Sequence, residues 1–260
     1  IGSGNIIHKK EAIFKKASVI IIDTQKMFKY LCDKRLLDKY QDYMLDDRMD
    51  LATFLQNNNI DKDVYSKWDA KELSLGDTKS TSQGDAKSKG ISSFVRDGSG
   101  RVYVPGSSLK GMLRTILTGA YIIKNTDCGV AKKLDDSKWK LGNHPYKGSM
   151  EKEYKAAMDD IEVQLFHKKL FSDPEGKNKL ENKINDSLRG FMVSDSEYIS
   201  DEDMCVCQKI DIGLEGKERT IPLYRECIKP GVSIKFSITI DSTFCDYDKK
   251  SIIEAIGPVS

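Results

Sequence analysis

Apolar side chains that alternate or cluster predict strands in both halves of this chain. Residues 17–23 form an apolar run rich in β-branched side chains, bounded by polar residues, which is typical of a buried strand. From Val232 to Ile240 apolar residues alternate with polar ones, which predicts a strand with one face in the core. Further strands are predicted over 190–193 and 205–210, and a hairpin over 91–96 and 101–104 around the turn 97–100.

Helical spacing of apolar residues predicts helices between these strands. One helical segment runs from about 24 to 50 with a break near Asp33, and another covers 150–170 as an insertion. A third begins after the Pro105-Gly106 turn and extends to about residue 121. Helices interleaved with strands that tend to pair antiparallel indicate an α+β fold.

The helix that follows the Pro-Gly turn has a basic first turn, which Ser107 or Ser108 is placed to cap. Lys110 and Arg114 lie one turn apart near a helix N-terminus that already carries about half a positive charge, an arrangement that costs on the order of 0.3–1 kcal/mol. An anion would offset that repulsion by binding free backbone N–H groups, and Gly111 would let a ligand backbone approach. A capped amphipathic helix with solvated basic residues explains the same pattern.

Composition leaves a nucleic-acid role open without requiring one. The 260 residues suggest one or two domains, and 42 Lys and Arg against 40 Asp and Glu give a net charge of +2. A nucleic-acid footprint must therefore be local. No apolar run approaches the ~20 residues of a membrane span and no secretory signal is visible, so we expect a cytoplasmic protein without a membrane partner.

Six cysteines and three histidines give no metal-binding pattern. Only Cys205 and Cys207 are close in sequence, and a single intervening residue suits neither a zinc knuckle nor a redox pair. We therefore expect reduced, partly buried thiols, no metal site and no cofactor.

Four short blocks of sequence resemble a known family. The string VPGSSLKGMLRT at 104–115 is similar to the PGSSLKG-R signature of RAMP-superfamily CRISPR proteins. The opening IGSG at 1–4 resembles the segment after the first strand of this family, and RGFMVSDS at 189–196 and IPLYREC at 221–227 agree with it. Together the four blocks resemble the fifth-subunit family of type III-A Csm effector complexes.

Two departures from the family pattern lead to further expectations. Ile1 stands where the first strand of the family should already have ended, so that strand is expected to be missing from this sequence. Nothing after Asp241 resembles the glycine-rich loop common among RAMP proteins, so RNA contacts from such a loop are not assigned.

The resemblance implies tandem ferredoxin-like or RRM-like (RAMP) modules with helical insertions. We place a soft boundary near residue 185, which gives an N-terminal module over 1–185 and a second, partial RRM-like module over 186–260. Gly, Ser, Thr, Lys and Asp dominate residues 74–90, which favours a loop there.

The function implied by the resemblance is that of a non-catalytic subunit that binds guide RNA (crRNA). Such a subunit would cap the end of the Csm filament that holds the 3′ region of the guide, and would pack on the last backbone subunit and on the small helical subunits. It would help to position the guide during maturation, with trimming left to an external nuclease. The RNA contacts that we predict are Gly2, Ser3, Gly4, Gly106, Ser107, Ser108, Lys110, Gly111, Arg114 and Arg189.

Two alternative functions stay open. A ribonuclease of the same superfamily would cut guide precursor with His8, the only histidine near a predicted contact, or target RNA with a loop carboxylate. Asp23 has no partner acid at a telling spacing, and Asp195 is expected to cap a turn. A protein scaffold with incidental RNA contacts would agree with the near-zero net charge.

Overall fold

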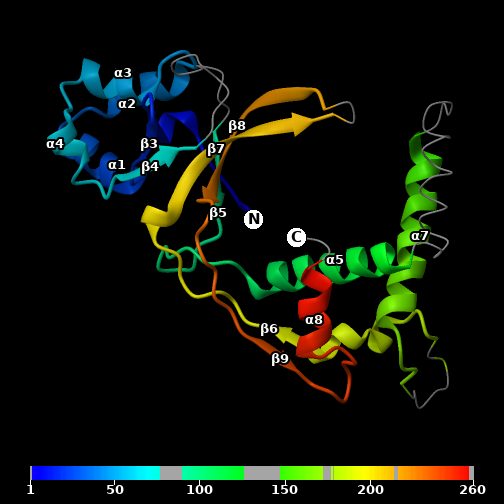
Figure 1. Ribbon diagram of the computed structural model, residues 1–260. Coiled ribbons are helices and arrows are strands. Elements are labelled where there is room, and N and C mark those ends of the chain that lie inside the picture. Colours follow the sequence, from blue (N-terminus) through cyan, green and yellow to red (C-terminus); the bar gives the residue numbers. More distant parts are fainter. Residues whose placement is uncertain are drawn as a thin grey trace. The chain divides into compact units, whose positions relative to one another are not determined.

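The chain folds as two compact units, each built from two separate segments (Figure 1). The computed structural model describes residues 2–76, 90–125, 147–171, 177, 179–213 and 216–257. Unit 1 comprises Ile1–Tyr103 and Glu197–Ile234, and unit 2 comprises Val104–Ser196 and Lys235–Ser260. The units do not follow the single boundary expected near residue 185, because the strands at 204–212 and 218–228 pair with N-terminal strands in unit 1.

The described residues of unit 1 form a mixed sheet of seven strands. They are β1 (Gly2–Ile7), β2 (Ala12–Phe14), β3 (Ser18–Ile21), β4 (Lys71–Leu75), β5 (Ile91–Phe94), β7 (Met204–Ile212) and β8 (Glu218–Ile228). Their order across the sheet is β1-β5-β8-β7-β4-β3-β2. β4 pairs with β7 and β5 pairs with β8 in parallel, whereas the other neighbours are antiparallel. The β7–β8 hairpin therefore forms the centre of the sheet.

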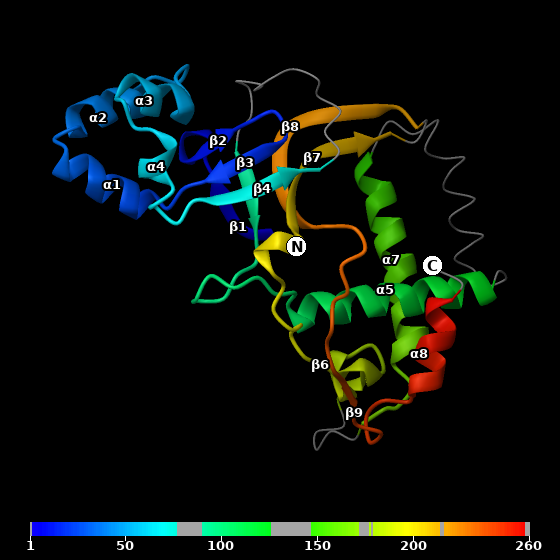
Figure 2. The ribbon, with the colours of Figure 1, turned by 60° about the vertical axis from the view of Figure 1, so that its left-hand side comes forward.

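A group of short helices covers the β2–β3–β4 end of this sheet (Figure 2). The helices are α1 (Thr24–Asp33), α2 (Leu37–Leu45), α3 (Leu51–Asn57) and α4 (Lys62–Tyr65), and the 3-10 turns of unit 1 are η1 (Lys9–Glu11) and η4 (Asp201–Asp203). Aspartates start three of the helices, because the carboxylates of Asp23, Asp50 and Asp61 accept backbone N–H groups of the first turn. Their core contains Met27, Leu31, Tyr43, Phe54 and Trp68, packed on β2 and β3 side chains.

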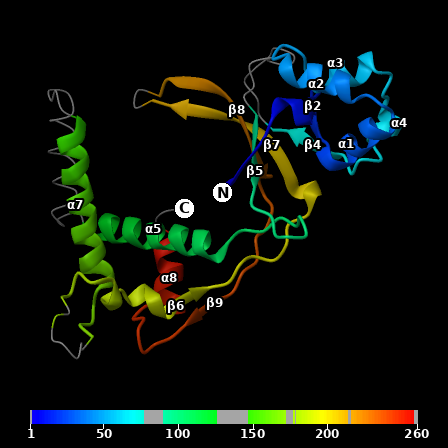
Figure 3. The same ribbon diagram turned by 180° about the vertical axis from the view of Figure 1, so that it is seen from behind.

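In its described residues, unit 2 has a small sheet and three helices that share one core (Figure 3). Its elements are α5 (Gly106–Lys124), α7 (Lys147–Phe166), α8 (Lys249–Ile256), β6 (Phe191–Val193), β9 (Ile238–Ile240), η2 (Lys183–Asn185) and η3 (Ser187–Gly190). β6 and β9 pair antiparallel. Leu113, Leu117, Phe166, Phe191 and Ile252 form the centre of its core. Within the described residues, no helix has both the length and the apolarity that crossing a bilayer requires.

Several predictions from the sequence pattern are confirmed. The apolar run at 17–23 contains β3, and the helical segment breaks after Asp33, where Arg35 takes a left-handed backbone with φ 56°. The predicted hairpin around 97–100 forms as β5 followed by a bridge between Arg96 and Val102. The α+β fold class is confirmed, and the division into tandem ferredoxin-like modules stays a prediction. Most of the loop predicted at 74–90 lies outside the described residues.

One expectation about strands was wrong. The alternating segment from Val232 to Ile240 forms a strand only over its last three residues, β9, because the preceding part runs across the unit boundary after Ile234. Gly2, Ser3 and Gly4 lie in β1, and the strand expected to precede them in the family pattern stays a prediction. Gly4 has a φ of +81° and falls where the pairing of β1 with β5 shifts register, so a glycine suits this irregular position.

Candidate functional site

The N-terminus of α5, which carries the PGSSLKG block, is capped by a residue distant in sequence. Pro105 occupies the N-cap position and α5 begins at Gly106. The Gly106 N–H donates to Asp195 Oδ1 at 2.7 Å, so the predicted cap by Ser107 or Ser108 was wrong. Asp195 was expected to cap a turn. It caps this helix instead, because its carboxylate accepts a backbone N–H that has no partner within the helix.

Gly106 is buried at a close crossing of two backbone segments within unit 2. A Cβ at this position would lie 2.8 Å from both the carbonyl carbon and the carbonyl oxygen of Ser194, and closer still to the Val193 carbonyl oxygen. The crossing is fixed nearby, since Val104 N–H donates to Ser196 Oγ at 2.9 Å and Ser196 N–H donates to the Val104 carbonyl at 3.0 Å. The first glycine of the PGSSLKG block is therefore required by internal packing.

The second glycine of the block, Gly111, has no such requirement. Among the described residues, no atom apart from its chain neighbours and the helix backbone around it lies within 4 Å of the place that a Cβ would take. Gly111 is exposed together with Ser107 and Thr115, which follow each other at four-residue spacing along one face of α5. Lys110 is half-buried beside this stripe. We call Ser107, Lys110, Gly111 and Thr115 the α5 face.

Arg114 is directed into unit 2. Its Nη1 donates to Asp186 Oδ2 at 2.7 Å and its Nη2 donates to Glu162 Oε2 at 2.9 Å. Its guanidinium lies 4.4 Å from the centre of the Phe166 ring. Burial opposes the charged form, but the two carboxylates outweigh it and raise the pKa of Arg114 above its ordinary value. The structure thus pairs Arg114 with two acids, and a phosphate would have to compete with both.

The remaining predicted RNA contacts are Arg189 and the segment formed by Gly2, Ser3 and Gly4. The Arg189 guanidinium stacks 3.9 Å from the Phe244 ring centre and 4.3 Å from that of Phe171, and its Nη1 donates to the Ile184 carbonyl at 2.7 Å. Gly2, Ser3 and Gly4 belong to unit 1, whereas the residues of the PGSSLKG block and Arg189 belong to unit 2. The predicted contacts are therefore divided between the two units.

The two residues weighed as catalytic groups make local structural contacts. His8 Nδ1 accepts the Lys10 N–H at 3.3 Å, and the His8 N–H donates to Glu11 Oε2 at 2.8 Å, so this pair forms a capping box at η1. Asp23 Oδ1 accepts the N–H groups of Gln25 and Lys26 at the start of α1. Both side chains have a structural role that needs no catalysis.

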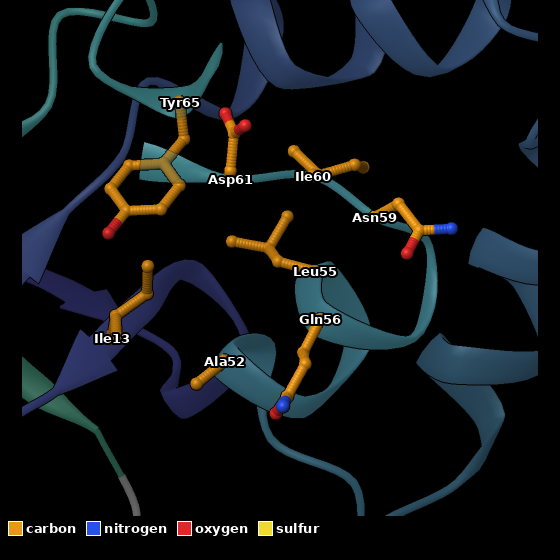
Figure 4. A pocket seen from close by; sticks show the side chains of 8 residues that line it. All are labelled: Ile13, Ala52, Leu55, Gln56, Asn59, Ile60, Asp61 and Tyr65. Atoms are coloured by element: carbon orange, nitrogen blue, oxygen red, sulfur yellow. The ribbon is translucent and has the colours of Figure 1, made fainter. Parts of the chain in front are cut away.

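A surface pocket of about 440 Å³ lies between α3, α4 and β2 in unit 1 (Figure 4). Ile13, Leu55 and Ile60 provide apolar walls, and Tyr65 lies across from them with Asp61 beside it. The other lining residues are Ala52, Gln56 and Asn59. The described lining holds a carboxylate and no basic side chain, so it does not favour an RNA phosphate.

Cys205, Cys207 and Cys227 lie close together on β7 and β8. Cys205 and Cys227 are partners across β7 and β8, and Cys205 Sγ lies 3.7 Å from Cys207 Sγ. Among the described residues, no group of three or more His, Cys, Asp or Glu is arranged to hold a metal ion. Burial, followed by the hydrogen bond with Cys207, raises the pKa of the Cys205 thiol to about 12. Cys128 lies outside the described residues.

We expect these thiols to differ strongly in reactivity in the native protein. At pH 8, iodoacetamide should label the exposed Cys32 at least about 100-fold faster than Cys205, because only the thiolate is nucleophilic. Peptide mass spectrometry after timed labelling measures both rates, and urea-unfolded protein supplies the reference in which both react readily. Equal native rates would contradict the buried, protonated state of Cys205.

Comparison with known proteins agrees with this architecture. A model of the RAMP superfamily matches residues 84–256. The CRISPR system Cms protein Csm5 of Enterococcus italicus is 28% identical over 93% of this chain and 56% of its own length, and Csm5 of Streptococcus thermophilus is 28% identical over 92% and 60%. The chain thus spans little more than half the length of these relatives.

Two solved structures share the fold. The crystal structure of T. onnurineus Csm5 matches 94% of this chain and 66% of its own with a TM-score of 0.63 and 22% identity. A chain in a cryo-EM structure of a Csm-crRNA-target RNA ternary complex of a type III-A CRISPR-Cas system matches 100% of this chain and 67% of its own, with a TM-score of 0.55 and 18% identity. Because the family model spans more than half of the sequence, this chain belongs to the RAMP superfamily, in which it resembles the Csm5 subunits of type III-A Csm systems.

Proposed function

We propose that this chain binds guide RNA as a non-catalytic subunit of a type III-A Csm complex, where it caps the end that holds the 3′ region of the guide. The similarity to Csm5 proteins, and to a chain of a Csm complex with crRNA and target RNA, supports this assignment. The observation that carries the proposal is the α5 face, where an exposed glycine without an internal packing role lies beside a lysine and two hydroxyl side chains.

The chemistry of the α5 face suits a sugar-phosphate backbone. A guide must be held whatever its sequence, so its protein contacts go to phosphates and 2′-hydroxyls. Lys110 would supply the charge and Ser107 a hydrogen-bonding hydroxyl, while the missing side chain at Gly111 would let the RNA approach the helix closely. Thr115 Oγ1 donates to the Gly111 carbonyl at 3.0 Å, so its hydroxyl would act toward a 2′-hydroxyl as an acceptor.

The other predicted contacts are secondary in this proposal. Gly106 and Ser108 would act by placing the helix start, and Arg114 would act indirectly by holding α5 to Glu162 and Asp186. Gly2, Ser3 and Gly4 would provide a second, backbone-only contact from unit 1. Arg189 is exposed, although its guanidinium stacks on two phenylalanine rings. One edge of the guanidinium would therefore be open to a phosphate.

We further propose that the partners are the last backbone subunit and the small helical subunits of the complex, and that an external nuclease trims the guide. The structural contacts of His8 support a non-catalytic role. Incubating the purified protein with labelled guide precursor, with and without a chelator, tests this point. Saturable cleavage that is abolished by His8→Ala or by chelation would favour the ribonuclease alternative.

We expect Lys110→Glu to weaken binding of a guide-like single-stranded RNA roughly tenfold at 0.1 M salt, because a phosphate partner is replaced by a repelling charge. The slope of log affinity against log salt should become shallower by about 0.7 for each phosphate that the variant no longer neutralises. Fluorescence anisotropy over a salt series measures both quantities. Arg114 is left unchanged in this test, since its substitution would also break two ion pairs.

The matched control is Lys124→Glu, which makes the same charge change at the exposed C-terminal end of α5. Gly111→Leu should also weaken RNA binding, because the leucine side chain would occupy the space beside the helix that the RNA needs. It should not lower the stability of the protein, because leucine has a higher helix propensity than glycine. If Lys110→Glu binds no more weakly than Lys124→Glu, the α5 face is a solvated surface and the scaffold alternative gains support.

A further inference from the structure

The turn after β5 holds an arginine in a fixed conformation. Asp97 Oδ1 accepts the N–H groups of Ser99 and Arg101, each at 2.9 Å. Asp97 Oδ2 accepts Arg101 Nε at 3.0 Å and Nη2 at 2.9 Å. The backbone closes the turn as well, since Asp97 N–H donates to the Arg101 carbonyl at 3.0 Å. One carboxylate therefore fixes both the main chain and the guanidinium of Arg101.

The ordered guanidinium stacks on a tyrosine from a distant part of unit 1. Arg101 Cζ lies 3.8 Å from the centre of the Tyr198 ring. A bridge between Val102 and Ile199 holds the two chain segments side by side. Tyr198 is nevertheless 54% exposed, and the Arg101 side chain is also 54% exposed. Two planar groups are thus presented to solvent in a fixed stack.

The charge balance of this stack indicates which ligand it suits. Asp97 neutralises Arg101 locally, so the pair offers little attraction to a phosphate. Stacking of a nucleobase on an aromatic ring or a guanidinium plane needs no net charge, and it accepts any base because every base has a π-face. Holding both side chains in place beforehand also removes part of the entropy loss that ordering them would otherwise cause on binding.

We propose that Arg101 and Tyr198 form a platform on which a base of single-stranded RNA stacks. This inference rests on the proposed function and adds a base contact from unit 1 to the backbone contacts of the α5 face in unit 2. Asp97 is a positioning residue in this arrangement. The platform does not read sequence, which is what a protein that holds guides of varied sequence requires.

The test compares oligoadenylate with an oligomer of equal length that carries abasic residues and therefore keeps the phosphates without the bases. Tyr198→Leu should weaken binding of oligoadenylate roughly tenfold and leave the affinity for the abasic oligomer within about twofold. Arg101→Gln should act in the same direction. Tyr198→Phe keeps the ring and should retain most of the affinity, which separates stacking from any contact of the tyrosine hydroxyl.

Two matched controls lie in the same unit. Phe28→Leu removes another exposed aromatic ring, which is 47% exposed, and Arg48→Gln removes an arginine that pairs with Asp46 and has a side chain 94% exposed. Neither should change the preference for oligoadenylate over the abasic oligomer. Circular dichroism and the midpoint of urea unfolding show whether each variant is folded.

Each possible result supports or overturns the platform. If Tyr198→Leu leaves both affinities unchanged while the wild type binds RNA, the platform is wrong and guide binding stands. An equal loss for both oligomers in folded protein overturns the platform as well, because the pair would then act on the backbone. If the wild type binds neither oligomer, both the platform and the proposed function fail.

Discussion

Replacing Gly106 by alanine is expected to lower the free energy of unfolding of unit 2 by about 2–3 kcal/mol, the upper range for overpacking a dense interior. The added methyl would meet the Val193 and Ser194 carbonyl groups, which are backbone atoms and cannot move aside as a side chain can. Moving α5 away would also lengthen the 2.7 Å hydrogen bond from the Gly106 N–H to Asp195. Urea unfolding, together with hydrogen exchange of the α5 amides, measures the loss.

The matched control is alanine at Gly111, five residues further along the same helix. Nothing described opposes a Cβ there, so this substitution should raise stability by about 0.5–1 kcal/mol through helix propensity alone. Opposite signs for the two glycines would confirm that one is required by packing and the other is not. If Gly106→Ala is as stable as the wild type, the start of α5 does not pass as close to the Ser194 backbone as the structure shows.

We expect Arg96→Met to destabilise unit 1 by about 3–5 kcal/mol, the usual penalty for removing one partner of a buried ion pair. The Glu226 side chain is only 1% exposed. One carboxylate oxygen of Glu226 accepts the Phe94 N–H at 2.8 Å, and the other pairs with the Arg96 guanidinium. Without Arg96, this carboxylate would stay buried with no opposite charge beside it. Chemical unfolding at pH 7 measures the effect.

Two further variants test that explanation. Glu226→Gln on the Arg96→Met background should recover most of the lost stability, because the amide oxygen still accepts the Phe94 N–H and the buried charge is gone. Arg48→Met, at an exposed pair with Asp46, should change stability by no more than about 0.5 kcal/mol. A small effect of Arg96→Met, or no recovery in the double variant, would contradict the role of the pair.

Elements with a strong local pattern were predictable, including β7 at the centre of the sheet, whereas its partner β8 was not. α5 follows a regular helical pattern over 19 residues and was predicted close to its observed start. β8 was missed because Pro222 interrupts it, and prolines argue against central strands. The structure resolves this conflict with a register shift in the β7–β8 pairing, between Gln208 and Ile210, opposite the segment that contains Pro222. Only the pairing itself reveals such a bulge.

The contacts of the candidate site could not be predicted from a local sequence pattern either. The sequence places Lys110 and Arg114 on one helix turn, but the acids that pair with Arg114 come 48 and 72 residues later. The cap that Asp195 supplies to α5 and the stack of Arg101 on Tyr198 also join residues far apart in sequence. A local pattern therefore identified the basic turn, and tertiary contacts decided which of its residues face solvent.

The central place of the β7–β8 hairpin also dictates when the sheet of unit 1 becomes continuous during synthesis. β1 and β5 lie on one side of the hairpin, and β2, β3 and β4 lie on the other. The first segment of unit 2 must leave the ribosome before β7 is made. Until then β4 and β5 present unpaired edges on the nascent chain, and such edges readily pair with other chains. A chaperone that shields these two edges would therefore act mainly before residue 228 emerges.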